Sequence, residues 1–83
     1  MNLVQWKKIE RQHVQSNEQK IIALLLQGCS NEEIGRELNM AARTVKSYFN
    51  RMFVRYGIRS GIKRVKLAAK LYREQLDNES YRA

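Results

Sequence analysis

Proline is absent from this chain of 83 residues, which also has only four glycines and a single cysteine. The lone thiol of Cys29 excludes a disulfide within the chain and fits a reducing compartment. We expect Cys29 to act as a small, buried apolar side chain. The scarcity of helix-breaking residues and a hydrophobic content of 43% indicate a compact helical domain rather than a disordered tail.

Long hydrophobic runs are also missing, since no apolar stretch approaches the ~18 residues that a membrane-spanning helix needs. The N-terminal residues Met1–Lys8 lack the ordered basic, apolar and cleavage regions of a signal peptide. We therefore expect a cytoplasmic protein with no membrane partner. Neither His13 nor Cys29 belongs to a metal-ligand cluster or a nucleophile pattern, so we expect no metal, no cofactor and no enzymatic activity.

Acidic residues are missing from residues 40–73, although this segment carries ten Lys and Arg residues. Residues 1–39 balance five cations against five acids, and the last ten residues are net acidic. The whole net charge of +8 therefore arises in one segment. Clustered cations favour a polyanionic partner, because they release the counterions that condense on a phosphate backbone.

Four amphipathic segments place the chain in the all-α class. Two of them begin with a capping box, at Ser16 and at Ser30, in which a hydroxyl and a Gln or Glu side chain bind each other's backbone amides. Gly28 and Gly57 suit the left-handed positions that follow helix ends. The four expected helices run from Ser16 to about Gly28, from Ser30 to Leu38, from Ala42 to Tyr56 and from Ser60 to Leu76.

The remaining parts of the chain are short. Residues 1–13 carry apolar side chains at helical spacing and predict a short helix or an ordered arm, in which Trp6 anchors the segment on the core or docks a partner protein. Residues 77–83 predict a polar, frayed tail. Gly35 lies inside the second helix, where glycine costs about 1 kcal/mol. We therefore expect a neighbouring helix to cross closely at Gly35.

Residues 31–38 and 42–56 have the pattern of a helix-turn-helix, because a turn of three residues joins two short helices and the second is cationic on its outer face. In such a motif the first helix braces the second, which enters the major groove of duplex DNA. The remaining residues 14–30 and 57–76 would complete one domain, with the last helix available for dimerisation.

Several segments resemble the LuxR-type helix-turn-helix, the DNA-binding domain of NarL/FixJ regulators. Residues Gly28–Ile34 are similar to its G-x-S-N-K-E-I-A segment, residues Thr44–Tyr48 to its T-V-K-x-H segment, and residues Tyr56–Ser60 to its linker into the last helix. The resemblance covers about residues 14–72 without a gap. Ala41 departs from it, since the family usually has Ser at the N-cap of the recognition helix.

The resemblance implies a sequence-specific transcriptional regulator that binds duplex DNA as a homodimer through residues 42–56. The base-facing residues would be Lys46, Ser47 and Asn50. The phosphate-binding residues would be Ser30, Asn31, Arg43, Thr44 and Arg51, to which the charge pattern adds Arg55. The dimer interface on the last helix would comprise Ile62, Val65, Ala69, Tyr72 and Leu76.

The roles of several cations and of the apolar stripe on the last helix stay open. Four cations either touch phosphates or supply long-range attraction, namely Arg55, Arg59, Lys63 and Arg64. We expect three others on the solvent side of the last helix, namely Lys66, Lys70 and Arg73. The apolar stripe of that helix is either pure core or part core and part dimer seam.

Because thirteen residues precede the domain, we expect a stand-alone, nucleoid-associated regulator similar to small GerE-like members of the family. Two alternative functions compete with this reading. One is a module like region 4 of sigma factors, which acts with RNA polymerase. The other is an adaptor or antirepressor that uses the fold to bind a regulatory protein without DNA.

Overall fold

The computed structural model describes residues 15–82, with side chains as far as Asn78. Four helices follow one another: α2 (Asn17–Leu26), α3 (Asn31–Leu38), α4 (Ala42–Arg55) and α5 (Lys63–Arg82). No strand occurs in this described range, so the expected all-α, four-helix class is confirmed. The prediction of a helix or arm at residues 1–13, with Trp6 as its anchor, lies outside the described residues.

Both predicted capping boxes are present. The backbone amide of Ser16 donates to Gln19 Oε1 at 2.9 Å, and the amide of Gln19 donates to Ser16 Oγ at 3.2 Å. Ser30 and Glu33 repeat this arrangement at the same two distances. Each box satisfies two amides that the first turn of a helix leaves without a partner, which fixes where α2 and α3 begin.

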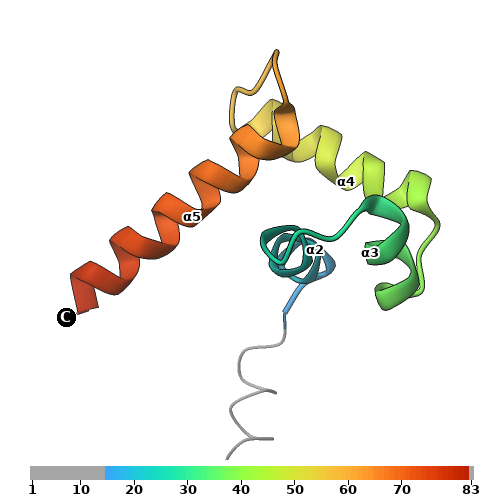
Figure 1. Ribbon diagram of the computed structural model, residues 1–83, viewed down its shortest axis with the longest axis horizontal. Coiled ribbons are helices and arrows are strands. Elements are labelled where there is room, and N and C mark those ends of the chain that lie inside the picture. Colours follow the sequence, from blue (N-terminus) through green and yellow to red (C-terminus); the bar gives the residue numbers. More distant parts are fainter. Residues whose placement is uncertain (1–14, 83) are drawn as a thin grey trace, which may run out of the picture.

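The core draws on all four helices and on one loop residue. Its nine buried side chains are Ile21, Leu25, Ile34, Val45, Phe49, Met52, Ile58, Leu67 and Leu71. Burying each of the larger side chains contributes about 1.5–3 kcal/mol to folding. Helix α4 lies across α2 and α3, and α5 packs against α2 and α4 through its N-terminal half (Figure 1). The core therefore holds the two helices of the motif at a fixed mutual orientation.

The turn between α3 and α4 depends on Gly35. A Cβ atom at this position would lie 2.5 Å from the carbonyl oxygen of Met40 and 3.6 Å from the amide nitrogen of Ala42. The closest approach comes from the backbone of the turn, and the start of α4, the neighbouring helix, contacts this position at Ala42. Asn39 adopts the left-handed conformation with φ +56°, which turns the chain back toward α3.

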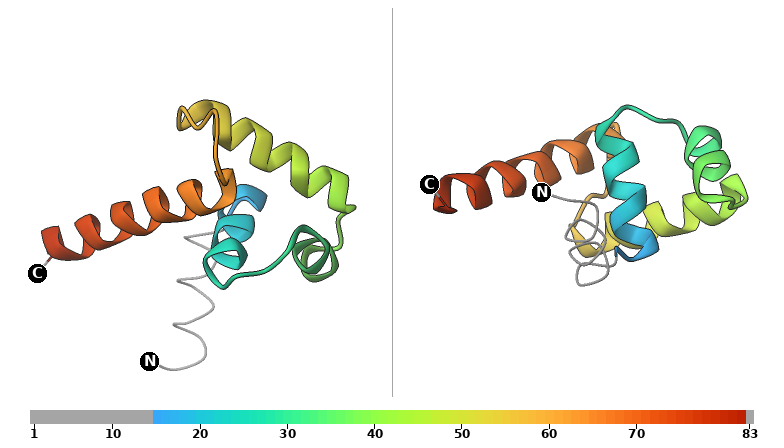
Figure 2. Two further views of the ribbon diagram at one scale, coloured as in Figure 1. Left: turned by 45° about the horizontal axis from the view of Figure 1, so that its top comes forward. Right: turned by 90° about the horizontal axis from the view of Figure 1, so that it is seen from below.

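Helix α5 differs from its expected bounds at both ends. It begins at Lys63 rather than near Ser60, because Gly61 has φ +79° and interrupts helical geometry. It also continues through Arg82, so the predicted frayed tail is wrong for residues 77–82. No glycine or proline follows Gly61, and nothing in the sequence stops the helix. Its C-terminal half extends away from the other three helices (Figure 2).

Candidate nucleic-acid interface

One face of α4 packs on the core and the opposite face meets solvent. The inner face consists of Val45, Phe49 and Met52, all buried. At about 100° per residue, Ser47 and Asn50 fall on the opposite side of the helix. Lys46 lies at the edge of that outer face, and all three predicted base-facing side chains are exposed. Their exposure is compatible with base contacts, which stay a prediction.

Two interactions organise the outer face of α4. The hydroxyl of Ser47 donates to the carbonyl oxygen of Arg43 at 3.1 Å, so the Ser47 oxygen is left to accept a hydrogen bond. The guanidinium carbon of Arg51 lies 4.5 Å from the centre of the Tyr48 ring. This cation–π contact restricts the long Arg51 side chain along the flank of the helix.

The N-terminus of α4 has no side-chain cap. Ala41 occupies the N-cap position with extended backbone, and its side chain offers no oxygen to the amides of the first turn. The Thr44 amide donates to the Ala41 carbonyl oxygen at 3.0 Å, which leaves the amides of Ala42 and Arg43 without a cap. Arg43 and Thr44 are both exposed in this turn. Uncapped amides, the helix dipole and the positive charge of Arg43 together favour an anion here. The predicted phosphate contacts of Arg43 and Thr44 are compatible with this geometry.

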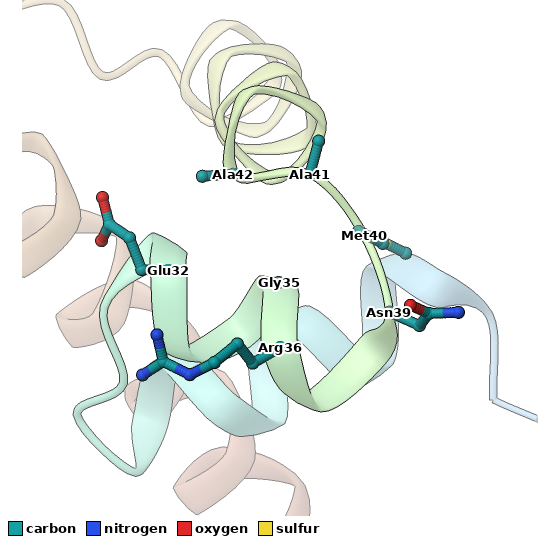
Figure 3. A pocket seen from close by; sticks show the side chains of 7 residues that line it. All are labelled: Glu32, Gly35, Arg36, Asn39, Met40, Ala41 and Ala42. Atoms are coloured by element: carbon teal, nitrogen blue, oxygen red, sulfur yellow. The ribbon is translucent and has the colours of Figure 1, made fainter.

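An open hollow of about 460 Å³ lies beside this turn, between α3 and the start of α4. Figure 3 shows Glu32 and Arg36 along α3 on one side of the hollow and Ala41 and Ala42 on the other. Gly35 lies between these two walls and also lines the hollow. Its lining combines one acid and one base, and we assign it no ligand.

The start of α3 is joined to α5 by Arg64. The Arg64 guanidinium donates to Asn31 Oδ1 and to the carbonyl oxygen of Cys29, and it lies over the Phe49 ring with its central carbon 4.6 Å from the ring centre. Arg64 is half-buried and makes a structural contact within this fold, a role that the sequence did not predict. Cys29, expected to be buried, is half-buried and packs against the core.

Arg55 has an acidic partner that the sequence pattern did not reveal. Its Nη2 atom lies 2.7 Å from Glu18 Oε2 on α2, and 53% of the Arg55 side chain is exposed. The hydrogen bond and the charge of Glu18 raise the pKa of the Arg55 guanidinium above its usual value. Glu18 therefore competes with any phosphate for Arg55.

Cations of α5 pack against the C-terminal end of α4. Lys70 is exposed, as expected, and its Nζ atom also donates to the carbonyl oxygen of Tyr56 at 3.0 Å. Lys63 Nζ lies 5.8 Å from the centre of the Phe53 ring. A cation at a helix C-terminus is favourable, because the dipole is negative there. Burial, followed by the negative charge of Glu74, raises the pKa of the Tyr56 hydroxyl at the same junction.

The predicted dimer residues form an exposed stripe that begins at Ile62, one residue before α5, and continues along that helix. Leu67 and Leu71 face the core, whereas the exposed fractions of Ile62, Val65 and Tyr72 are 72%, 62% and 55%. Leu76 is 43% exposed and Ala69 is also exposed. At about 100° per residue the stripe lies on the side of α5 away from the core. The alternative that the stripe is pure core is therefore wrong for this fold.

Sequence reasoning missed two residues of this region. Val54 is 82% exposed and shares the outer face of α4 with Ser47 and Asn50. The spacing of these three residues, at intervals of three and four, could have revealed it, and an apolar side chain there suits a thymine methyl group. Arg64 carried no such signal, because its partners lie 33 and 35 residues away in the sequence.

Within residues 15–82, no group of His, Cys, Asp or Glu side chains is arranged to hold a metal ion. Among the helices described, none combines the length and apolarity that crossing a membrane would require.

Comparison with known proteins gives one match. The family model GerE, described as bacterial regulatory proteins of the luxR family, matches residues 16–68, more than half of the chain. The match includes the whole of α2, α3 and α4 and the first turns of α5. Neither the curated proteins nor the solved structures yielded a match.

Proposed function

The chain belongs to the luxR family of bacterial regulatory proteins and is at that level a DNA-binding transcription regulator; we propose that it binds specific duplex sequences as a homodimer, with α4 as the recognition helix. Lys46, Ser47 and Asn50 would read base edges in the major groove. Most of the affinity would come from phosphate contacts, which fix the register of the protein on DNA. The proposal locates the protein at the nucleoid.

The observation that carries this proposal is the division of α4 into a buried face and an exposed polar face. The three base-facing candidates are exposed, while the opposite face is anchored by Val45, Phe49 and Met52. A rigid helix with such a free polar face fits a major groove about 12 Å wide. The acid-free segment 40–73 supplies the positive charge that this placement needs.

The homodimer is supported by the stripe on α5. A small monomer rarely exposes a contiguous row of Ile, Val, Tyr and Leu side chains without a partner. Pairing this stripe with its copy would remove apolar area from water and place two α4 helices on one duplex. Binding of the second helix then becomes intramolecular, which raises affinity without any new contact.

The test is selection of bound duplexes from a random pool, followed by sedimentation of the complex. A consensus with two-fold symmetry and a mass of two chains per duplex would support both parts of the proposal. A consensus without symmetry and one chain per duplex would contradict the dimer. Affinity no better than that of any basic protein would favour an adaptor, and binding only with added RNA polymerase would favour a module like sigma region 4.

A further inference from the structure

Arg64 is the one arginine of the described residues that joins three parts of the fold. We propose that Arg64 is a positioning residue, which orients the side-chain amide of Asn31 for a DNA phosphate and does not touch DNA itself. The inference rests on the proposed function, because it assigns a cause to one of the phosphate contacts predicted there.

The contacts of Arg64 fix its guanidinium in one place. Arg64 Nη1 donates to Asn31 Oδ1, and Nη2 donates to the carbonyl oxygen of Cys29. The plane of the group lies over the Phe49 ring, at 4.6 Å from the ring centre. Two directed hydrogen bonds and a stacking contact together leave the guanidinium little rotational freedom.

The orientation of the Asn31 amide follows from the chemistry of its partner. A guanidinium carries only donors, so it binds the oxygen of a side-chain amide and never its nitrogen. With Oδ1 held by Arg64, the Nδ2 group and its two N–H donors are directed away from Arg64. The side of the Asn31 amide turned away from Arg64 therefore presents N–H donors, which can bind a phosphate oxygen.

The place of Asn31 in the fold adds to this argument. Asn31 is the first residue of α3, directly after the N-cap Ser30. The positive end of the helix dipole and the backbone amides of the first turn favour an anion at this position. The Nδ2 donors would supplement those amides, and Arg64 would prevent the amide from flipping its oxygen toward the phosphate.

Arg64 itself is poorly placed to bind DNA. Its side chain is half-buried against Phe49, and two of its nitrogens already donate to protein oxygens. Extending the guanidinium outward to a phosphate would pull it away from Phe49 and from these two oxygens. The structure therefore separates Arg64 from exposed cations such as Arg43 and Arg51, which need no such rearrangement.

The experiment is a double-mutant cycle on the full chain, with Asn31→Ala, Arg64→Met and the double variant. Affinity is measured for the duplex that the wild type selects, across a range of salt concentrations. We expect each single variant to bind about threefold to tenfold more weakly, as for the loss of one hydrogen bond. The double variant should bind no more weakly than Asn31→Ala, because Arg64 acts through Asn31.

Non-additivity in the cycle is the readout that a merely structural role would not move, and the salt dependence separates a positioning role from direct phosphate binding. Asn31 is a neutral amide and releases no counterion when it binds a phosphate. The slope of log affinity against log salt for Arg64→Met should therefore match the slope for the control Lys20→Met, which removes one exposed charge on α2. If the slope for Arg64→Met is smaller in magnitude than the control's by about 0.9, Arg64 binds a phosphate directly and the inference is overturned. Additive losses in the cycle would overturn it as well.

Asn31→Asp tests the inference even if Asn31→Ala or Arg64→Met fails to fold. An aspartate keeps an oxygen acceptor for Arg64 but has no donor for a phosphate. The unfolding free energy of Asn31→Asp should be at least that of the wild type, while its DNA affinity should fall more than tenfold. Wild-type affinity would overturn the inference.

Failure of the inference can be distinguished from failure of the proposed function. If the wild type selects no duplex, the proposed function fails. If the wild type selects a duplex and the cycle is additive, only the role of Arg64 fails.

Discussion

The carbonyl oxygen of Met40 lies 2.5 Å from the point that a Cβ atom on Gly35 would occupy. The amide of Met40 in turn donates to the carbonyl oxygen of Gly35 at 2.8 Å. These two contacts hold the turn against α3 and so set the angle at which α4 leaves it. The orientation of α4, which we propose as the recognition helix, therefore depends on a residue that has no side chain.

Replacing Gly35 by Ala should destabilise the protein. Alanine favours a helix by about 1 kcal/mol over glycine, but here its methyl group would meet backbone that cannot move without opening the turn. We expect a net loss of about 1–3 kcal/mol in the free energy of unfolding, measured by urea denaturation. Arg36→Ala in the same helix is the control and should change it by less than about 0.5 kcal/mol. A Gly35→Ala protein as stable as the wild type would contradict the close approach.

Replacing Lys46 by Ala should affect sequence discrimination as well as affinity. If Lys46 binds a base edge, its loss costs about 1–3 kcal/mol and relaxes selectivity at one base pair. Arg51→Ala is the contrast, because loss of a phosphate contact weakens all sequences alike and lowers the salt slope by about 0.9. Titration of duplexes that carry single substitutions measures both. Unchanged affinity and selectivity for Lys46→Ala would show that the predicted register of α4 is wrong.

Removing the charge of Glu18 should strengthen DNA binding. Glu18 Oε2 lies 2.7 Å from Arg55 Nη2, and this exposed pair contributes little to stability. Glu18→Gln frees Arg55 for a phosphate, so affinity for every duplex should rise by about threefold and the salt slope should steepen. Glu37→Gln, an exposed acid on α3, controls for the general gain in positive charge. Equal gains in the two variants would indicate that Arg55 contacts no phosphate.

Placing a charge in the stripe of α5 should separate the two copies. Val65 is 62% exposed, so Val65→Glu removes no core contact, yet it would bury a carboxylate in a paired stripe. Sedimentation equilibrium should show a monomer, and circular dichroism should show unchanged helicity. Gln75→Glu makes the same charge change at an exposed position outside the stripe and should leave the assembly intact. Identical sedimentation of both variants and the wild type would rule out this interface.

Acid should weaken the start of α3 through Glu33. Hydrogen bonds from the backbone and then the side chain of Ser30 hold the pKa of the Glu33 carboxyl below its usual 4.5. A lowered pKa in the folded state stabilises the fold above pH 4.5, and this stabilisation is lost as the pH falls through the lowered value. Between about pH 6 and about pH 3 the Tm of the wild type should therefore fall further than that of Glu33→Gln, which retains an acceptor oxygen but does not titrate. Parallel falls in Tm would exclude Glu33 as the titrating group.

Local features of the fold were predictable from the sequence because they depend on neighbouring residues. The capping boxes at Ser16 and Ser30 act over three residues, and Gly28 provides its left-handed turn whatever the rest of the chain does. The start of α5 was missed, because a glycine adopts either sign of φ and only the structure shows that Gly61 has φ +79°. The two faces of α4 follow from helical periodicity alone, which places Phe49 in the core and Asn50 in solvent.

By itself, the sequence determined the class of the fold, the helix-turn-helix motif and the concentration of positive charge, since all three follow from periodicity and composition. Only the tertiary structure decided which cations are free. Arg64 turns inward to Asn31, Arg55 pairs with Glu18, and Lys70 binds the end of α4 at Tyr56. Each contact joins residues on different elements of the fold, and a charge has no periodicity that reveals its partner. Packing of the core alone brings these groups within hydrogen-bonding distance.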